Sequence, residues 1–329
     1  MFRKFSIVST LILFALNVTA TGCSGVSIPT SQTSSNASGI QRHRQFGGSW
    51  SAKAPMLKAR YALAAGVVND ELFTVGGSNG ADDGLNTVEA YDPATNTWIT
   101  KSSMPTARSF LAVGVANGLL YAVGGENDNS GVLNTVEAYD PTTDTWTTKK
   151  HMLALRTALA LGVVDGILYA VGGSGVSGVL NRVDAYDPAT NIWTMKARMP
   201  TRRFDLAVGV VNGILYAVGG ADKKITPLNT VEAYDPATDS WTTKAPMPTP
   251  RYGLSVSVLG GNLYAIGGYN QGFLDTVEVY HPATDSWTTE TPMPTARMLL
   301  ASRVVGNTIF AVGGVNGGLL NTVEAFSLH

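Results

Sequence analysis

Residues 60–101 read RYALAAGVVNDELFTVGGSNGADDGLNTVEAYDPATNTWITK, and this stretch decides the fold because the chain repeats it. It begins with an arginine and carries a Gly-Gly pair sixteen residues later, at Gly76 and Gly77. The same arginine and spacing recur five more times, 46 to 48 residues apart. The six arginines are Arg60, Arg108, Arg156, Arg203, Arg251 and Arg297. A period of about 40 to 50 residues is typical of β-propellers, so the sequence predicts one structural unit written six times.

Within one copy, the residues predict four strands. Residues 62–68 and 72–75 are apolar runs joined by a short turn, and this turn is Asn-Gly or Asp-Gly in three other copies. Such dipeptides favour type I′ hairpins, so the two strands should pair antiparallel. At the Gly-Gly pair we expect positive φ or a close backbone approach. After a loop of variable length, residues 86–91 form the third strand, an Asp-Pro turn follows, and residues 98–101 form the fourth.

The tryptophans predict how the ring closes. One stands in each fourth strand, but Trp50 precedes the first copy, and the last copy ends after Phe326 without a tryptophan. The segment around Trp50 should therefore supply the fourth strand of the last blade. This pairing of the chain ends removes an open sheet edge. The sequence thus predicts an all-β, six-bladed propeller with four antiparallel strands per blade.

The recurring Gly-Gly, tyrosine and tryptophan positions resemble the kelch family. The resemblance covers residues 46–329, which we interpret as one kelch propeller domain. Two departures are small. Phe326 replaces the repeated tyrosine, and His281 replaces the aspartate of the Asp-Pro turn.

The first 22 residues are typical of an export signal. A basic start at Arg3 and Lys4 precedes an apolar stretch over 5–18, which is too short to span a bilayer. Two cleavage sites fit: a small-x-small site ending at Ala20, and a lipobox-like site at Cys23, the single cysteine, which would then carry a lipid. In such lipoproteins a following serine implies the outer membrane. Residues 23–45 are a Ser/Thr-rich tether. We expect an exported protein of a bacterial cell envelope, anchored by lipid or released as a periplasmic or secreted protein.

The composition does not predict a strongly basic surface on this chain. The net charge is −1, so no nucleic-acid footprint is expected. Glycine contributes 36 of 329 residues, and only 14% are charged, which fits short strands and tight turns. We expect a monomeric propeller that meets a membrane only through a lipid anchor.

The repeated arginines allow two interpretations. By the kelch resemblance they would ring one mouth of the central channel, where six guanidinium groups would bind an anion. Alternatively, each arginine pairs with an acid of the third strand, and one such acid exists in every copy: Glu89, Glu137, Asp184, Glu232, Glu278 and Glu324. The sequence leaves both open.

Differences between copies are the better pointers to ligand contacts. Directly after the arginine stand three aromatic residues, Tyr61, Phe204 and Tyr252, which would stack on a sugar or a peptide side chain. The variable loops after Gly-Gly add candidate ligand residues: Asn79, Glu126, Asn127, Asp222, Tyr269 and Asn270. Arg303 stands where four copies have glycine and one has serine, so it either projects into the channel or reaches solvent or a nearby partner.

Known enzymatic kelch chemistries find little support. Galactose oxidase needs copper and a cysteine-linked tyrosine, but no cysteine lies inside the repeats. The four histidines show no short metal-ligand spacing, and the histidine of the Glu-x-x-Asp-x-x-x-His iron pattern is missing. We expect no metal and no cofactor. One enzymatic alternative remains, because exported bacterial kelch propellers include N-acetylneuraminate epimerase, which needs only a positioned acid and base and an arginine for the carboxylate.

Together these patterns predict a non-catalytic binding module for an anionic glycan or an acidic protein segment at an arginine-lined mouth. A sialate-type mutarotase is the first alternative, with a mouth acid such as Glu126 taking part. A structural envelope protein without a small ligand is the second.

Overall fold

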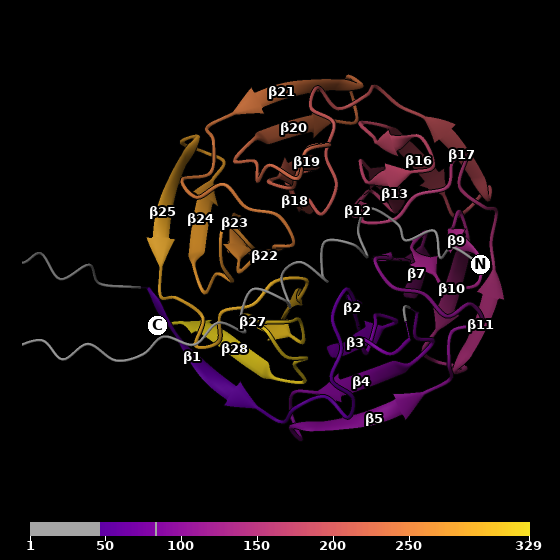
Figure 1. Ribbon diagram of the computed structural model, residues 1–329, viewed down its shortest axis with the longest axis horizontal. Helices are drawn as coiled ribbons and strands as arrows, with labels where there is room; N and C mark the ends of the chain where they lie inside the picture. The colour runs from indigo at the N-terminus through magenta and orange to yellow at the C-terminus, as the bar shows by residue number, and fades with distance from the viewer. Residues whose placement is uncertain (1–46, 83) are drawn as a thin grey trace, which may run out of the picture.

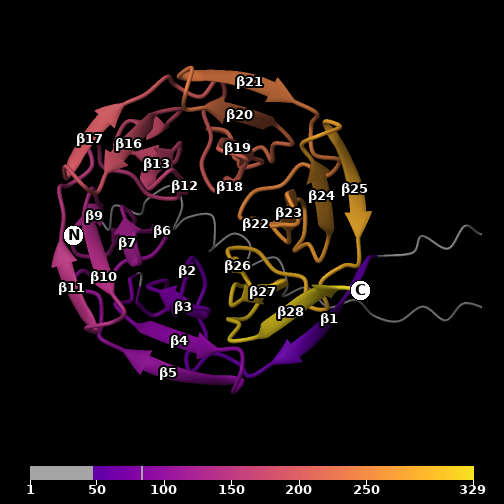
Figure 2. The same cartoon turned by 180° about the vertical axis from the view of Figure 1, so that it is seen from behind.

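A ring of six four-stranded antiparallel sheets makes up the protein, as the computed structural model shows for residues 47–82 and 84–329. Figures 1 and 2 show this ring from its two faces, with one sheet per blade around a common axis. The expected all-β, six-bladed propeller is therefore confirmed.

Each blade has an innermost strand, two middle strands and an outer strand. The innermost strands are β2 (Ala64–Val68), β6 (Ala112–Ala116), β12 (Ala160–Val164), β18 (Ala207–Val211), β22 (Ser255–Leu259) and β26 (Ala301–Val305). The second strands are β3 (Glu71–Val75), β7 (Leu119–Val123), β13 (Ile167–Val171), β19 (Ile214–Val218), β23 (Asn262–Ile266) and β27 (Thr308–Val312). The third strands are β4 (Val88–Asp92), β10 (Val136–Asp140), β16 (Val183–Asp187), β20 (Val231–Asp235), β24 (Val277–His281) and β28 (Val323–Leu328). The outer strands are β5 (Thr97–Lys101), β11 (Thr145–Thr148), β17 (Ile192–Met195), β21 (Ser240–Lys244), β25 (Ser286–Glu290) and β1 (Gly48–Lys53). Short hairpins in two loops pair β8 (Glu126–Asn127) with β9 (Gly131–Val132), and β14 (Ser174–Gly175) with β15 (Gly178–Val179).

The innermost strand begins later than the sequence predicts. In the first blade β2 starts at Ala64 rather than at residue 62, because Ala62 has a φ of 51° and leaves the extended conformation. The corresponding residue of every other blade also has positive φ. This shared bend belongs to the site described below.

The Gly-Gly pair meets both expectations drawn from the sequence. Gly76 has a φ of 65° and Gly77 a φ of 103°. A Cβ on Gly76 would also lie 2.6 Å from the main-chain oxygen of Arg108 in the next blade. The hairpin turn is confirmed as well, because Asn117 and Gly118 have φ values of 51° and 76°, as a type I′ turn requires.

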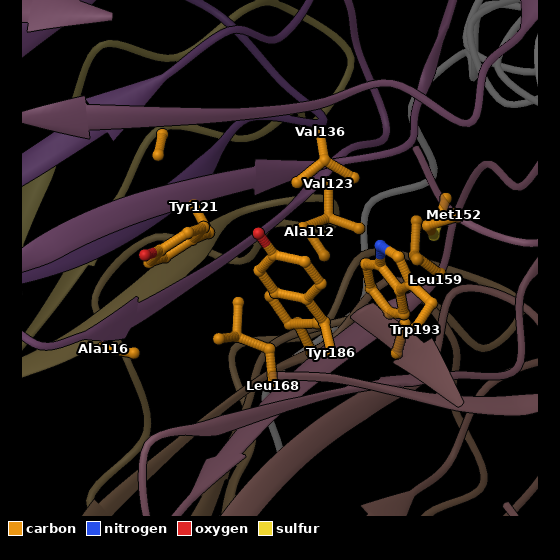
Figure 3. Close-up of a cluster of buried hydrophobic side chains, with 13 residues drawn as sticks. Ala112, Ala116, Tyr121, Val123, Val136, Met152, Leu159, Leu168, Tyr186 and Trp193 are labelled. Atoms are coloured by element: carbon orange, nitrogen blue, oxygen red, sulfur yellow. The ribbon is translucent and has the colours of Figure 1, made fainter. Parts of the chain in front are cut away.

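The hydrophobic core lies between neighbouring blades. Figure 3 shows one such cluster, in which the Tyr121 ring lies 5.9 Å from that of Tyr186, and Tyr186 lies 5.0 Å from Trp193. Met152 of the connector is only 3% exposed in the same cluster. The repeated methionines, tyrosines and tryptophans therefore serve blade packing, because their counterparts fill the equivalent positions of the other clusters.

Each outer strand is also bonded to the preceding blade. Trp146 Nε1, for example, donates to the main-chain oxygen of Ser102 at 2.9 Å. In the last blade this role falls to β1, which pairs antiparallel with β28 (Figure 1) and whose Trp50 Nε1 donates to Thr291 O at 3.0 Å. The predicted closure by the chain ends is confirmed.

The predictions for the N-terminal region lie outside the described residues. These are the signal over 1–22, the tether over 23–45 and the lipid at Cys23. Within residues 47–82 and 84–329, no helix has the length and apolar character that crossing a membrane requires.

Candidate functional site

The six repeated arginines are fully buried between strands of their own blades. Each has 0% exposed surface and forms an ion pair with the third-strand acid of its blade. The pairs are Arg60–Glu89 at 3.2 Å, Arg108–Glu137 at 2.7 Å, Arg156–Asp184 at 2.7 Å, Arg203–Glu232 at 2.8 Å, Arg251–Glu278 and Arg297–Glu324. Of the two interpretations of the arginines, the geometry therefore matches the structural ion pair.

Main-chain oxygens accept hydrogen bonds from the Nη1 atom of each guanidinium group. Arg108 Nη1 donates to Gly124 O at 3.2 Å and to Thr135 O at 2.9 Å. The same bond to the first glycine, sixteen residues on, occurs in five of the six copies, whereas Arg156 Nη1 donates to Ala170 O. Burial lowers the pKa of Arg108 to about 10, so the group stays charged at neutral pH. Since these side chains are completely buried and their terminal nitrogens are bonded within the blade, the six arginines do not offer an anion-binding ring at the mouth, and that expectation is corrected here.

The mouth of the channel is instead bounded by a closed ring of main-chain hydrogen bonds. Six residues, each two positions after the arginine, form this rim: Ala62, Phe110, Ala158, Asp205, Gly253 and Leu299. Each amide donates to the oxygen of the rim residue in the preceding blade, over 2.7 to 3.0 Å. All six have positive φ, between 50° and 61°. This common conformation precedes the innermost strand in every blade, and in it each rim residue bonds the rim residues of both neighbouring blades.

The aromatic residues expected to stack on a ligand are buried beside the rim. Tyr61 is 5% exposed, Phe204 1% and Tyr252 6%, and all three belong to one apolar cluster. Their rings are therefore largely occupied by packing. Two aromatic residues at the edge of this cluster are more exposed: Tyr269, whose ring lies 5.6 Å from that of Tyr252, and Phe273, whose ring lies 5.5 Å from that of Tyr269.

Polar candidates of the variable loops mostly stabilise their own loops. Asp222 Oδ1 accepts from the amides of Lys224 at 2.8 Å and Thr226 at 3.0 Å, and the latter bond contributes most to lowering the pKa of Asp222. Asn79 and Asn127 accept from amides of their own turns in the same way, and Asn270 donates its amide to Gly272 O. These four residues are spread over different blades.

Two buried acids from different blades interact at the mouth. Glu126 of the second blade is 4% exposed, and Asp205 of the rim is 9% exposed. Burial, and secondarily the charge of Glu126, raise the pKa of Asp205 to about 7. Asp205 in turn contributes to raising the pKa of Tyr252, after burial. Sequence reasoning named Glu126 but missed Asp205, although Asp205 is the one acid among the six residues at its repeat position.

Arg303 lies in the channel between two cavities. The rim cavity has a volume of about 130 Å³ and is lined by the rim residues and by Arg303. The far cavity, of about 320 Å³, is lined by Arg303 and by the valines of the innermost strands. Arg303 donates to the main-chain oxygens of Ser302 at 2.8 Å and of Val113, two blades away, at 3.2 Å. Of its two interpretations, the one in which Arg303 projects into the channel fits this position.

Packing explains why the other blades have a small residue where Arg303 stands. A Cβ on Gly66, Gly114, Gly162 or Gly209 would lie 2.7 to 2.8 Å from a leucine methyl group of the next blade. Ser257 fits because its hydroxyl bonds that of Ser302 at 2.8 Å. Burial lowers the pKa of Arg303 to about 10, so it is cationic at neutral pH. No acid of residues 47–82 and 84–329 forms an ion pair with it.

Comparison with known proteins gives the family. A family model described as the Attractin/LZTR1 beta-propeller matches residues 42–277, and a Kelch motif model matches residues 296–329. The chain belongs to the Attractin/LZTR1 β-propeller family. The kelch resemblance drawn from the sequence is thereby confirmed. No curated protein matches this Attractin/LZTR1-type propeller.

A solved structure supports the fold of this Attractin/LZTR1-type propeller. The structure of YjhT matches with a TM-score of 0.71 and 17% identity, covering 82% of this chain and 94% of that one. The fold-level similarity to N-acetylneuraminate epimerase expected from the sequence is likewise confirmed. At this identity the likeness shows the fold alone.

The channel of this Attractin/LZTR1-type propeller offers a cation and a protonatable acid in one cavity. Arg303 can bind a carboxylate, sulfate or phosphate, and Asp205 can donate or accept a proton near neutral pH. Within the part of the chain that the structure describes, no three His, Cys, Asp or Glu residues are grouped to hold a metal ion.

Proposed function

We propose that this kelch propeller is a non-catalytic binding module that takes an anionic group into its central channel, where Arg303 holds it. The observation that carries the proposal is a charged guanidinium inside the channel that bonds main-chain oxygens and forms no ion pair with an acid of the described residues. A partly desolvated cation without an ion-pair partner favours an incoming anion, and guanidinium forms strong charge-assisted bonds to carboxylates.

An acidic glycan is the ligand class that suits this site best. The rim cavity, at about 130 Å³, admits a carboxylate and the atoms next to it rather than a folded protein surface. The partly exposed rings of Tyr269 and Phe273 lie on the apolar cluster beside the rim, where the rest of a sugar would contact them. An acidic protein segment would present the same carboxylate chemistry, so it forms a separate arm of the test.

The test compares acidic with neutral sugars in thermal unfolding of the full chain. Ligand at about 100 times its Kd adds roughly 2.7 kcal/mol of stability, which is a shift of several degrees. We expect stabilisation by uronates and sialic acid but not by neutral sugars, and loss of this effect in Arg303→Gln. Exposed Arg202, in the connector before Arg203, provides the control Arg202→Gln, which should retain it.

Two results would reject the anion site. One is an equal effect of neutral and acidic sugars; the other is undiminished stabilisation of Arg303→Gln. Stabilisation by an acidic peptide and by no sugar would indicate that the ligand is an acidic protein segment. No effect of either class would favour the structural envelope protein without a small ligand.

A sialate-type mutarotase is the second candidate, and Asp205 is the observation that favours it. A carboxyl group with a pKa of about 7 can act as acid and as base at neutral pH, and it lines the same cavity as Arg303. Exchange between the anomers of sialic acid, followed by NMR magnetisation transfer, tests it. Acceleration that disappears in Asp205→Asn while binding persists would establish an enzyme. Exchange at the uncatalysed rate would reject the mutarotase and favour the non-catalytic binding module.

Export and lipid anchoring also belong to this proposal, and they rest on the sequence alone. Cys23 and the apolar stretch before it are their basis. We expect the wild-type chain, expressed in a bacterium, to partition with the outer membrane and to incorporate labelled fatty acid, and Cys23→Ser to do neither. A soluble exported wild-type protein, cleaved near Ala20, would favour the ordinary signal instead.

A further inference from the structure

We infer that the rim cavity recognises both ends of its ligand: Arg303 binds a carboxylate at the inner end, and Asp205 accepts a hydrogen bond from a hydroxyl or ammonium group at the rim. This inference rests on the anion site proposed above and adds the chemistry of the ligand's other end. It requires the carboxylate-bearing end of the ligand to carry a hydrogen-bond donor a few atoms away from the carboxylate.

Asp205 is a buried carboxyl group without a hydrogen-bond partner for its side chain among the described residues. Its exposed fraction is 9%, and its amide is used in the rim, where it donates to Ala158 O at 3.0 Å. The other five rim residues have no polar side chain. The oxygens of this carboxyl group are not fully enclosed, and a largely desolvated carboxylate without a partner in the protein costs free energy. A donor supplied by a ligand would satisfy it.

The charged groups around Asp205 favour a hydrogen-bond donor of the ligand at this end of the cavity and disfavour a second anion. Glu126 is the acid that acts on Asp205, and Tyr252 is the nearby phenol that Asp205 acts on. No Lys, Arg or His of residues 47–82 and 84–329 forms an ion pair with Asp205. The rim end of the cavity is therefore acidic, whereas the inner end carries the cation Arg303. A ligand matching both ends has opposite polarity along its length.

The wall between the two ends is aliphatic. It includes six leucines, one from each blade, three positions after the repeated arginine: Leu63, Leu111, Leu159, Leu206, Leu254 and Leu300. The cavity volume of about 130 Å³ equals that of about four molecules of liquid water. A chain of a few carbon atoms between the two polar ends fits such a space.

Calorimetric titration of the full-length chain at pH 8 with three acids of equal length tests this inference. The acids are butyrate, 4-hydroxybutyrate and 4-aminobutyrate. We expect the two acids with a donor to bind at least about tenfold tighter than butyrate, which corresponds to one good hydrogen bond. Asp205→Ala should bind all three acids as weakly as wild type binds butyrate. Asp128→Ala, which removes an exposed acid of the β8–β9 loop, should keep the preference.

The outcomes separate this inference from the proposed anion site. Equal affinity of the three acids, or a preference that survives Asp205→Ala, would overturn the role of Asp205 while leaving Arg303 in place. Absence of binding of every acid would overturn the anion site itself. Tighter binding of 4-aminobutyrate alone would show that Asp205 selects an ammonium group. Equally tight binding of 4-aminobutyrate and 4-hydroxybutyrate would show that Asp205 accepts either donor. A thermal melt of each variant verifies folding, and Asp205→Ala should melt no lower than wild type at this pH because it removes a buried charge.

Discussion

Trp50, near the start of the described chain, lies directly opposite Phe326, near its end, with their rings 5.3 Å apart. This pair occupies the place that a tyrosine and a tryptophan of one continuous blade hold elsewhere, as Tyr139 and Trp146 do at 5.1 Å. The last blade is therefore completed by a strand that enters from the other end of the sequence.

Removal of this closing contact should destabilise the whole ring. Trp50→Ala loses the ring contact and the bond from Nε1 to Thr291 O, and we expect it to cost about 2–4 kcal/mol of unfolding free energy. Deletion of residues 46–54 should cost more, because it also exposes the edge of β28. Urea unfolding measures both. Ile99→Ala in β5, where the wild-type residue is 50% exposed, is the control and should stay within about 0.5 kcal/mol of wild type. A deletion variant of wild-type stability would refute closure by β1.

The buried ion pairs should be essential for stability rather than for ligand binding. Glu137→Gln leaves Arg108 charged and unpaired in the blade, and we expect a loss of about 3–5 kcal/mol. Chemical unfolding of this variant beside Asp128→Asn, an exposed acid-to-amide change, isolates the effect of burial. A stable Glu137→Gln protein that had lost affinity for acidic ligands would instead indicate that the repeated arginines take part in ligand binding.

Stability should fall with rising pH because of Asp205. The unfolded carboxyl has a pKa of about 3.9, whereas in the folded protein the value is about 7. Between these pH values the folded state keeps a proton that the unfolded state has lost, so stability falls with each pH unit up to about pH 7, by roughly 3 kcal/mol between pH 5 and pH 8. Asp205→Asn should lack this decline and exceed wild type in stability at pH 8. Urea midpoints at pH 5 and pH 8 measure it, and identical profiles of the two proteins would contradict the assignment.

The first glycine of each Gly-Gly pair should tolerate no side chain. Gly76→Ala combines a φ of 65° with a Cβ 2.6 Å from Arg108 O, whereas Gly131→Ala has a φ of 68° and open space around the new atom. We expect about 1–2 kcal/mol of conformational cost at both positions and about 1–3 kcal/mol more at Gly76 from the close approach. The difference between the two thermal or urea midpoints measures how tightly the blades meet. Equal losses of stability in the two variants would show that the neighbouring blade moves away from the new Cβ of Gly76→Ala at no cost in free energy.

The repeat made the fold predictable, because one set of offsets occurs six times and each copy tests the others. Closure followed from Trp50 and Phe326 by the same comparison. The site was harder to predict. An arginine that pairs with an acid inside a blade and an arginine that faces a channel mouth would give the same sequence pattern. The direction of the side chain depends on where the innermost strand begins. The positive φ at Ala62, which shifts that beginning, has no clear sequence signal.

Sequence comparison between the copies identified Arg303 as a candidate site residue but did not identify Asp205. Both break a repeated pattern, so comparison of the copies finds them, as it found Arg303. Asp205 was missed because only other positions of the repeat were compared. Their common cavity, and the interaction of Asp205 with Glu126 two blades away, depend on the ring geometry, which brings together residues far apart in the chain.

The rim of six main-chain hydrogen bonds has neither a first nor a last member. Each blade donates one bond to the blade before it and accepts one from the blade after it, so displacement of any blade breaks bonds on both sides. The six amide protons should therefore exchange with solvent together, at a rate set by opening of the entire propeller. Occupancy of the cavity below would slow all six, including those that no ligand atom touches.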